Sequence, residues 1–294
     1  MDWHELEPGI HACIRPAEGA NLGLIATGEG WVLMDTAFCA LELLSALDAR
    51  GVVLADLRLT FNSHFHADHT WGNQLVHSPI LGHWRCRELM LRCAEDEWSP
   101  AARERWLAEI AATHPDEAAR CRERLTDLRV TAPDDVFRRA RRLTLGKRRL
   151  EFLHCGGHSP DLSVMWLPDD GVLFAADLLF RGRYPYLGDA DVPAWTRALA
   201  RLARLTPARV VPGHGGLAAA ADLDRQRVYL EETWQRCAEH RARGRSLEAM
   251  LADPRFPGLE DVPDPGGQHR LAGIRAIAAL EAAATTAPPH AATA

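Results

Sequence analysis

The segment SHFHADHTWGN at residues 63–73 gathers four polar side chains within six positions: His64, His66, Asp68 and His69. It follows LRLTFN (57–62), whose pattern predicts a strand, and precedes an expected helix start near Gly72. A strand-to-helix loop need not send alternate side chains to opposite faces, so all four can converge. Imidazole and carboxylate suit zinc, and also iron or manganese, whereas closed structural zinc sites more often use thiolates. The segment therefore predicts a catalytic metal site with an open position.

Three further motifs place a metal-binding residue type beside a predicted strand. GGHSPDLS (156–163) contributes His158, VLFAADLLF (172–180) contributes Asp177, and VVPGHGG (210–216) contributes His214. With the first motif, they make the chain resemble the metallo-β-lactamase superfamily over about residues 8–216, in the family's motif order.

The resemblance implies a complete set of ligands for two metal ions, expected to be Zn²⁺ with iron or manganese as alternatives. One ion is assigned His64, His66 and His158; the other is assigned Asp68, His69 and His214; Asp177 bridges them. Asp35 in WVLMDT matches an acidic residue that orients the histidine loop, although a strand-end turn residue explains it equally well.

This ligand set implies a binuclear, zinc-dependent hydrolase in which a metal-bridging hydroxide attacks an ester-type bond, with Asp68 and Asp177 as catalytic carboxylates. The family's β-lactamases generally lack a bridging aspartate, whereas its thioester and lactone hydrolases keep one. Asp177 therefore favours a thioesterase first and a lactonase second, close to the glyoxalase II-like and lactonase-like branches. Two alternatives stay open: a regulatory protein of the same fold with a lidded site, and a β-lactamase.

The segment RGRYPYLGDAD (181–191) directly follows Asp177 and is expected to line the substrate pocket. Tyr184 and Tyr186 are candidate catalytic residues that would donate hydrogen bonds to an oxyanion. Arg181 and Arg183 could bind an anionic group of the substrate. An ordinary solvated loop is an equally good explanation of the segment.

Alternating strand and helix patterns predict an α/β protein, and the resemblance implies a four-layer αβ/βα sandwich. We expect residues 1–222 to form this domain, with a helical insertion at about 84–136. Residues 223–294 have helical character and are expected to pack on the same domain as a C-terminal extension, ending in a loose tail at about 285–294.

Composition excludes several classes of protein. The chain has 294 residues, 47% of them hydrophobic, which is enough for a full-sized core. Its net charge of −6 argues against a nucleic-acid partner, and no long apolar run suggests a membrane span. Seven cysteines without a CxxC pair suit reduced thiols. The sequence thus predicts a cytoplasmic enzyme with a small-molecule substrate, and a homodimer through the C-terminal helices is compatible with it.

Overall fold

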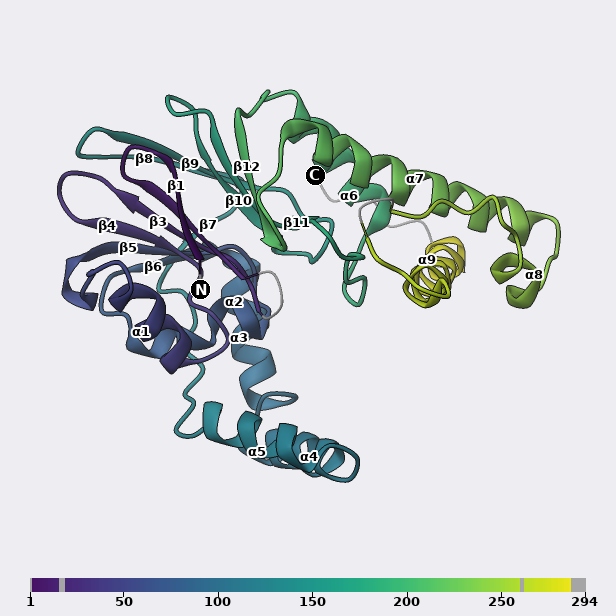
Figure 1. Cartoon of the computed structure of the whole chain (residues 1–294), viewed down its shortest axis with the longest axis horizontal. Coiled ribbons are helices and arrows are strands. Elements are labelled where there is room, and N and C mark those ends of the chain that lie inside the picture. Colours follow the sequence, from purple (N-terminus) through teal and green to yellow (C-terminus); the bar gives the residue numbers. More distant parts are fainter. Residues whose placement is uncertain (1, 16–18, 260–261, 287–294) are drawn as a thin grey trace.

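The computed structural model describes residues 2–15, 19–259 and 262–286, which form two β-sheets and a set of helices (Figure 1). The first sheet contains β1 (Asp2–Glu7), β2 (Ile10–Ile14), β3 (Leu22–Ala26), β4 (Trp31–Met34), β5 (Leu57–Asn62), β6 (Ile80–His83) and β7 (Asp135–Phe137). The second contains β8 (Ala140–Leu145), β9 (Arg148–His154), β10 (Ser163–Leu167), β11 (Val172–Phe180) and β12 (Arg209–His214). The α-helices are α1 (Ala40–Asp48), α2 (Ala67–Thr70), α3 (Trp84–Glu95), α4 (Pro100–Ala111), α5 (Pro115–Arg124), α6 (Val192–Ala203), α7 (Ala220–Ala242), α8 (Leu247–Leu251) and α9 (Gln268–Thr286), with short 3₁₀ turns at Leu54–Asp56 and Trp71–Leu75.

Strand order follows the chain within each sheet. The first sheet runs β1 to β7, antiparallel up to β4 and parallel from β4 onward. The second runs β12-β11-β10-β9-β8, with β11 and β12 as its parallel pair. Parallel neighbours need a crossover, which α1 supplies between β4 and β5 and α6 supplies between β11 and β12. The carboxyl ends of these parallel strands meet at one edge.

The main core lies between the two sheets. Phe61 of the first sheet packs against Phe152 of the second with ring centroids 4.6 Å apart, and both side chains are fully buried. Met34, Met165 and Phe174 belong to the same cluster. Both inner faces are therefore apolar and pack on each other, as in a sandwich.

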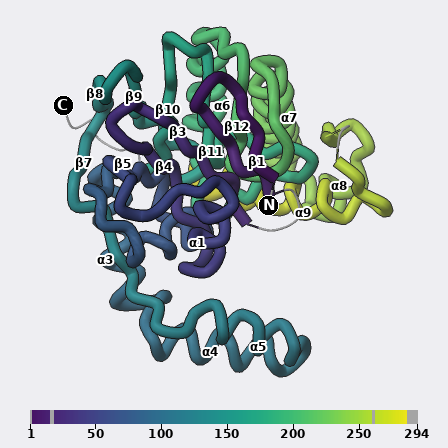
Figure 2. Tube along the Cα trace, turned by 60° about the vertical axis from the view of Figure 1, so that its left-hand side comes forward, coloured from purple at the N-terminus to yellow at the C-terminus, as the bar shows by residue number. Residues whose placement is uncertain are grey.

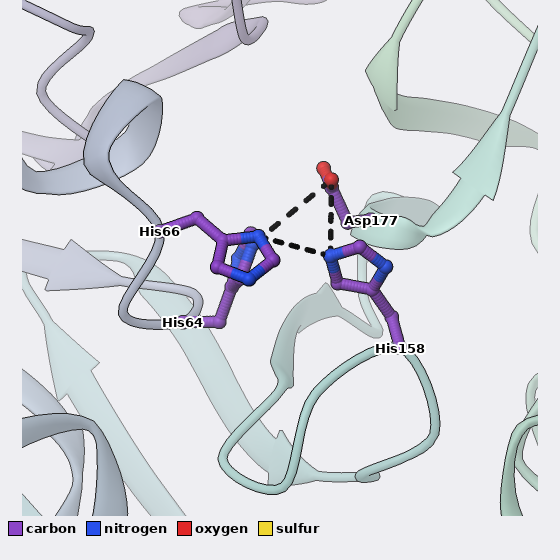
Figure 3. Close-up of side chains that lie close together, drawn as sticks. All are labelled: His64, His66, His158 and Asp177. Atoms are coloured by element: carbon purple, nitrogen blue, oxygen red, sulfur yellow. Dashed lines mark hydrogen bonds and ion pairs between the residues drawn. The ribbon is translucent and has the colours of Figure 1, made fainter. Parts of the chain in front are cut away.

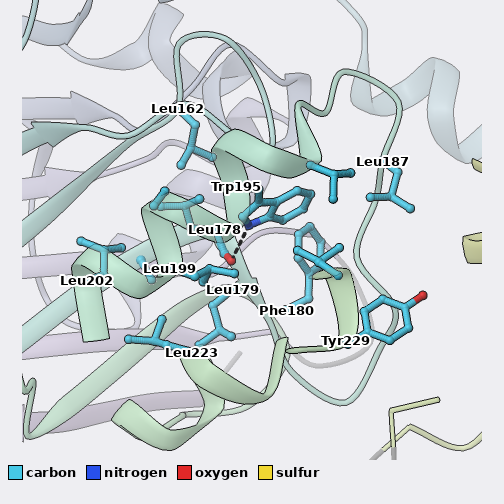
Figure 4. Packing of buried hydrophobic residues seen from close by; sticks show 14 of the residues in the cluster. Leu162, Leu178, Leu179, Phe180, Leu187, Trp195, Leu199, Leu202, Leu223 and Tyr229 are labelled. Carbon is cyan, nitrogen blue, oxygen red and sulfur yellow. Dashed lines mark hydrogen bonds between the residues drawn. The ribbon is translucent and has the colours of Figure 1, made fainter. Parts of the chain in front are cut away.

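Helices cover the outer face of each sheet. Leu43 and Leu47 of α1 pack on the outer face of β3 and β4, and Trp195 and Leu199 of α6 pack on the second sheet (Figure 4). Trp195 is completely buried, and its indole nitrogen donates to the Leu178 carbonyl at 2.9 Å. The four layers of the predicted αβ/βα sandwich are confirmed.

The stretch predicted as a helical insertion contains α3, α4 and α5. Helices α4 and α5 begin at Pro100 and Pro115 and form a hairpin at one end of the molecule (Figures 1 and 2). The Ser99 hydroxyl caps α4 by accepting the Ala102 amide. The helices of this stretch end at Arg124, and β7, which pairs with β6, begins at Asp135 beside the predicted boundary at about 136.

The C-terminal helices lie on the outer side of α6. Helix α7 packs along α6, and α9 packs along α7 (Figure 1). In the predicted loose tail, residues 285 and 286 belong to α9, and residues 287–294 lie outside the described residues. None of the described helices combines the length and hydropathy needed to cross a bilayer.

Candidate metal centre

Four chain segments carry the predicted ligands to one edge of the sandwich. The histidine loop follows β5, His158 lies on the loop before β10, Asp177 lies within β11, and His214 ends β12. β11 and β12 are parallel neighbours, and Asp177 lies in the irregular stretch between the pairs Ala176–Pro212 and Phe180–His214, which brings its carboxylate beside His214. A Cβ at Gly213 would overlap the Asp177 carboxylate, so only glycine permits this approach.

The first group of potential ligands consists of His64, His66, His158 and Asp177, which point toward a common centre (Figure 3). His158 Nε2 lies 3.2 Å from His66 Nδ1 and 3.4 Å from Asp177 Oδ2. His64 Nε2 lies 4.0 Å from the same Asp177 oxygen. The ligand atoms of this group are all within 4.8 Å of one another.

The second group consists of Asp68, His69 and His214, and it reaches the same aspartate. His214 Nε2 lies 3.3 Å from Asp68 Oδ2 and 3.4 Å from Asp177 Oδ2. His69 Nε2 lies 3.1 Å from Asp177 Oδ1. The Asp177 carboxylate therefore stands between the two groups, the place of the bridge that the resemblance implied.

Hydrogen bonds at the outer ring nitrogens orient the histidines. His69 Nδ1 donates to Asp35 Oδ2 at 2.7 Å, and His214 Nδ1 donates to the Gly19 carbonyl at 3.1 Å. His158 Nδ1 donates to the Tyr186 carbonyl at 3.2 Å. In a ring that carries one proton, placing it on Nδ1 leaves the lone pair on Nε2, so these three histidines can present Nε2 to a cation.

Asp35 has the orienting position that its place in the sequence suggested. Its two carboxylate oxygens accept from the amide and the hydroxyl of Ser63, both at 2.8 Å, besides holding His69. Asp35 is 1% exposed and has a φ of 59°, a left-handed conformation that aspartate and asparagine adopt more readily than most residues. It fixes both the loop and the ring.

Burial and the dense packing of charges shift the pKa values of the cluster in opposite directions. Burial lowers the pKa of His158 to about 3 and holds that of His64 well below its usual range. Burial also acts to lower the pKa of His69, but the carboxylates of Asp177, Asp68 and Asp35 outweigh it and raise the pKa well above 6.5. Burial acts to raise the pKa of Asp177, yet the surrounding imidazoles hold it well below its usual range. His64 and His158 are thus held uncharged, whereas His69 and the Asp177 carboxylate each favour their charged forms.

The two groups fit divalent cations. Zinc–nitrogen bonds of about 2.0–2.1 Å in a tetrahedral site place ligand atoms ~3.3 Å apart, and several pairs here lie 3.1 to 3.4 Å apart. Within the described residues, the buried Nε2 atoms of His64 and His69 make no hydrogen bond. Orphaned buried nitrogens are costly unless another partner takes them, which a bound cation would do.

A cavity of about 460 Å³ opens over this cluster. Phe65, Trp98, Phe180 and Tyr186 supply aromatic walls, and Arg183 lies at the rim. The rings of Phe65 and Trp98 stack with centroids 6.0 Å apart. The cavity thus combines a polar floor with apolar sides, as small-molecule sites do.

The segment after Asp177 divides between this cavity and other surroundings. Tyr186 and Arg183 line the cavity as predicted. Tyr184 does not: its hydroxyl accepts from the Leu259 amide at 3.3 Å, and it lines a separate cavity. Arg181 pairs with Asp222 at 3.0 Å instead of facing the cluster. Two expectations are corrected, that Tyr184 donates to an oxyanion and that Arg181 binds an anionic group in this cavity, because neighbouring residues of a loop can point in different directions.

Asp189 is a residue at this site that sequence reasoning missed. Its Oδ2 accepts from His66 Nε2 at 2.9 Å, so His66 presents Nδ1 to the first group while the other histidines present Nε2. This hydrogen bond lowers the pKa of Asp189. The sequence contains only a weak indication of this role: Asp189 belongs to the segment at residues 181–191, but it lies 123 residues from His66 along the chain.

Comparisons with known proteins agree with the fold. The sequence model of the metallo-beta-lactamase superfamily matches residues 15–214. A curated relative, metallo-beta-lactamase type 2 from Bacteroides fragilis, is 43% identical over 65 residues, which cover 20% of this chain and 26% of that protein. The chain therefore matches only about a quarter of that relative's length.

Solved structures share the fold at low identity. A metallo-beta-lactamase from Pontibacter korlensis has a TM-score of 0.59 and 22% identity, covering 78% of this chain and 98% of the other. A stereoselective inverting sec-alkylsulfatase from Pseudomonas sp. has a TM-score of 0.71 and 17% identity, covering 98% of this chain and 52% of the other.

The chain belongs to the metallo-beta-lactamase superfamily. With two clusters of histidine and aspartate at the edge of the sandwich, family membership indicates a metal-dependent hydrolase that uses divalent cations.

Proposed function

We propose that the protein is a binuclear metal-dependent hydrolase that cleaves an ester-type bond of a small molecule, a thioester first and a lactone second. The observation that carries the proposal is the position of Asp177, whose carboxylate lies 3.1 to 3.4 Å from histidines of both groups. A carboxylate shared by both groups can bridge two adjacent cations. When bound, such cations lower the pKa of water from 15.7 to about 7, which supplies a hydroxide nucleophile at neutral pH, and they polarise a carbonyl oxygen.

The chain's own residues would position the substrate and manage the proton. Asp68 lines the cavity with a side chain that is 29% exposed, so it can take a proton at its carboxylate and return it to the leaving group. Phe65, Trp98 and Phe180 would give the reacting bond apolar walls. Tyr186 lines the cavity, and its hydroxyl remains our candidate for donating to an oxyanion.

Sulfate-ester hydrolysis is a second candidate. It is favoured by one observation: the similarity to the sec-alkylsulfatase extends over 98% of this chain and thus includes the C-terminal helices, whereas the Pontibacter structure covers 78%. Arg183 at the cavity rim would suit an anionic group. A β-lactam belongs among the substrates tested, because relatives carry that name.

The test is a hydrolysis panel with protein loaded with zinc, iron or manganese in turn. It contains acyl-CoA and glutathione thioesters, lactones, a secondary alkyl sulfate and a β-lactam. We expect turnover of one ester class that Asp177→Asn reduces by at least ~10³-fold, in the range lost with essential catalytic groups. Asp169→Asn is the matched control, because Asp169 is a surface carboxylate paired with Arg149 at 2.8 Å. Turnover that survives Asp177→Asn would contradict the proposal.

A further inference from the structure

A second cavity lies beside the one over the metal centre and shares two of its lining residues. Arg183 and Tyr186 line both cavities. The second has a volume of about 570 Å³, within the ~300–1,000 Å³ typical of small-molecule sites. One wall is the loop at residues 183–188 and the other is helix α9, so we name it the α9 cavity.

Small side chains on α9 create this space. Ala272, Gly273, Ala276 and Ala279 line the cavity together with Leu280. Their spacing places them along one side of the helix. Gly273 is required by a close approach, because a Cβ there would lie 2.5 Å from the hydroxyl oxygen of Tyr229 on α7. Glycine inside a helix costs about 1 kcal/mol relative to alanine, and here it lets α9 pack on α7.

The wall is held firmly in place. Ile274 and Ile277, at most 1% exposed, anchor α9 in the core cluster of the second sheet. Arg241 of α7 makes two hydrogen bonds of 2.6 Å to the Glu281 carboxylate. The Tyr184 ring stacks on that of His269 with centroids 6.3 Å apart, so the loop and the helix are joined directly. The α9 cavity is therefore a fixed feature of the fold.

The loop side of the cavity is equally well supported. Leu187 is buried in the same core cluster as Phe180, whose ring lines the metal-site cavity (Figure 4). Tyr186 connects the two spaces: its ring centroid is 5.7 Å from that of His66, and its carbonyl holds His158. A ligand that passes Tyr186 from the α9 cavity therefore arrives beside the first group of metal ligands.

We propose that the α9 cavity binds the unbranched apolar chain of an acyl or alkyl substrate whose reacting bond lies at the metal centre. This proposal rests on the proposed function. The lining fits such a chain, since it is mostly alanine, leucine, proline and aromatic ring, with Arg183 at the junction beside the polar end. Arg183 would pair with a carboxylate or sulfate next to the reacting bond.

Binding of two fatty acids tests the cavity without requiring turnover. Decanoate and butyrate would be titrated calorimetrically into the metal-loaded protein. We expect decanoate to bind more tightly, by about fourfold for each additional methylene that is buried. Equal affinities for the two acids would overturn the proposal.

Tryptophan substitutions locate the chain. Ala279→Trp should remove most of the preference for decanoate, because Ala279 is an exposed residue on the cavity wall and can change without disturbing the core. Ala276→Trp changes a more buried residue of the same wall and should also remove the preference for decanoate. Circular dichroism would verify that this variant is folded. Ala284→Trp is the control, an exposed residue of the same helix outside the lining. Preference retained in Ala279→Trp would overturn the assignment.

A chain-length series separates this proposal from the proposed function. For the ester class that is hydrolysed, Ala279→Trp should lower kcat/KM for the decanoyl substrate at least tenfold and leave the acetyl substrate unchanged. Hydrolysis without any chain-length preference would refute the α9 cavity and leave the hydrolase standing. Selective decanoate binding without hydrolysis of any ester would refute the hydrolase and leave the α9 cavity as a binding site. A dimer that buries α9 and binds no decanoate would assign this face to a second copy and overturn the proposal.

Discussion

Asp35 offers the sharpest test of how the metal centre is organised. Asp35→Asn preserves the size of the side chain and suits its φ of 59°, since asparagine tolerates left-handed backbone. It removes the negative charge that faces His69 Nδ1 at 2.7 Å. The neutral amide can no longer hold the ring as strongly, so His69 should become a weaker ligand. The effect should fall on the group formed by Asp68, His69 and His214.

The size of the effect follows from this geometry. Loss of a carboxylate that orients a metal-binding histidine typically lowers metal affinity 10- to 100-fold, or about 1.4–2.7 kcal/mol. Asp35 is 1% exposed and holds three hydrogen bonds, so we expect the upper end of this range. Asp189→Asn is the corresponding substitution beside His66. Because the Asp189 side chain is 41% exposed, we expect its loss of metal affinity to lie at the lower end of this range.

Competition with a chromogenic chelator would measure the two zinc affinities separately. Asp35→Asn should weaken one of them, and Asp189→Asn should weaken the other. Circular dichroism would verify that both variants are folded. If Asp35→Asn changed neither affinity by more than about threefold, well short of the typical loss, the assignment of His69 as a ligand oriented by Asp35 would be wrong.

Three other substitutions test the surroundings of the site. Gly213→Ala should displace the Asp177 carboxylate and reduce metal binding to less than one ion per chain, measured by inductively coupled plasma mass spectrometry. Tyr184→Phe should leave kcat unchanged and lower stability to urea by about 0.5–1.5 kcal/mol, the worth of one hydrogen bond. Burial lowers the pKa of His83 to about 4 in the folded protein. Between pH 6.5 and about 4 the unfolded chain therefore holds a proton on His83 that the folded protein does not. As the pH falls through this range, the free energy of unfolding decreases by up to about 1.4 kcal/mol per pH unit. His83→Phe should remove that part of the pH dependence, measured by urea unfolding at pH 7.5 and 5.

Each of these substitutions has an outcome that would count against the account. Full metal content in Gly213→Ala would mean that the carboxylate does not need this approach. A large fall in kcat for Tyr184→Phe would return that hydroxyl to the active site. Identical pH dependence of unfolding in His83→Phe and the unsubstituted protein would show that His83 takes up no proton on unfolding.

Local motifs explain how much of the site could be predicted. His64, His66, Asp68 and His69 occupy one short loop, and each remaining ligand sits beside a strand that the hydrophobic pattern marks clearly. β10 and β11 are buried along their whole length, so their apolar runs were visible in the sequence. The resemblance then supplied the order in which these segments meet.

Elements without a strong local pattern could not be predicted. β1 is a largely exposed edge strand with the sequence DWHELE, and β7 has three residues, so neither shows a clear alternation. Tyr184 and Tyr186 are equivalent by chain position, and only the packing of α9 and the Leu259 amide separates their surroundings. The pairing of His66 with Asp189 depends on tertiary structure alone.

Anomalous diffraction at the zinc edge from crystals of the zinc-loaded protein tests the central claim most directly. The account predicts two peaks in each chain, one among His64, His66 and His158 and the other among Asp68, His69 and His214, with Asp177 between them. A single peak, or peaks outside these residues at full zinc loading, would contradict the binuclear centre.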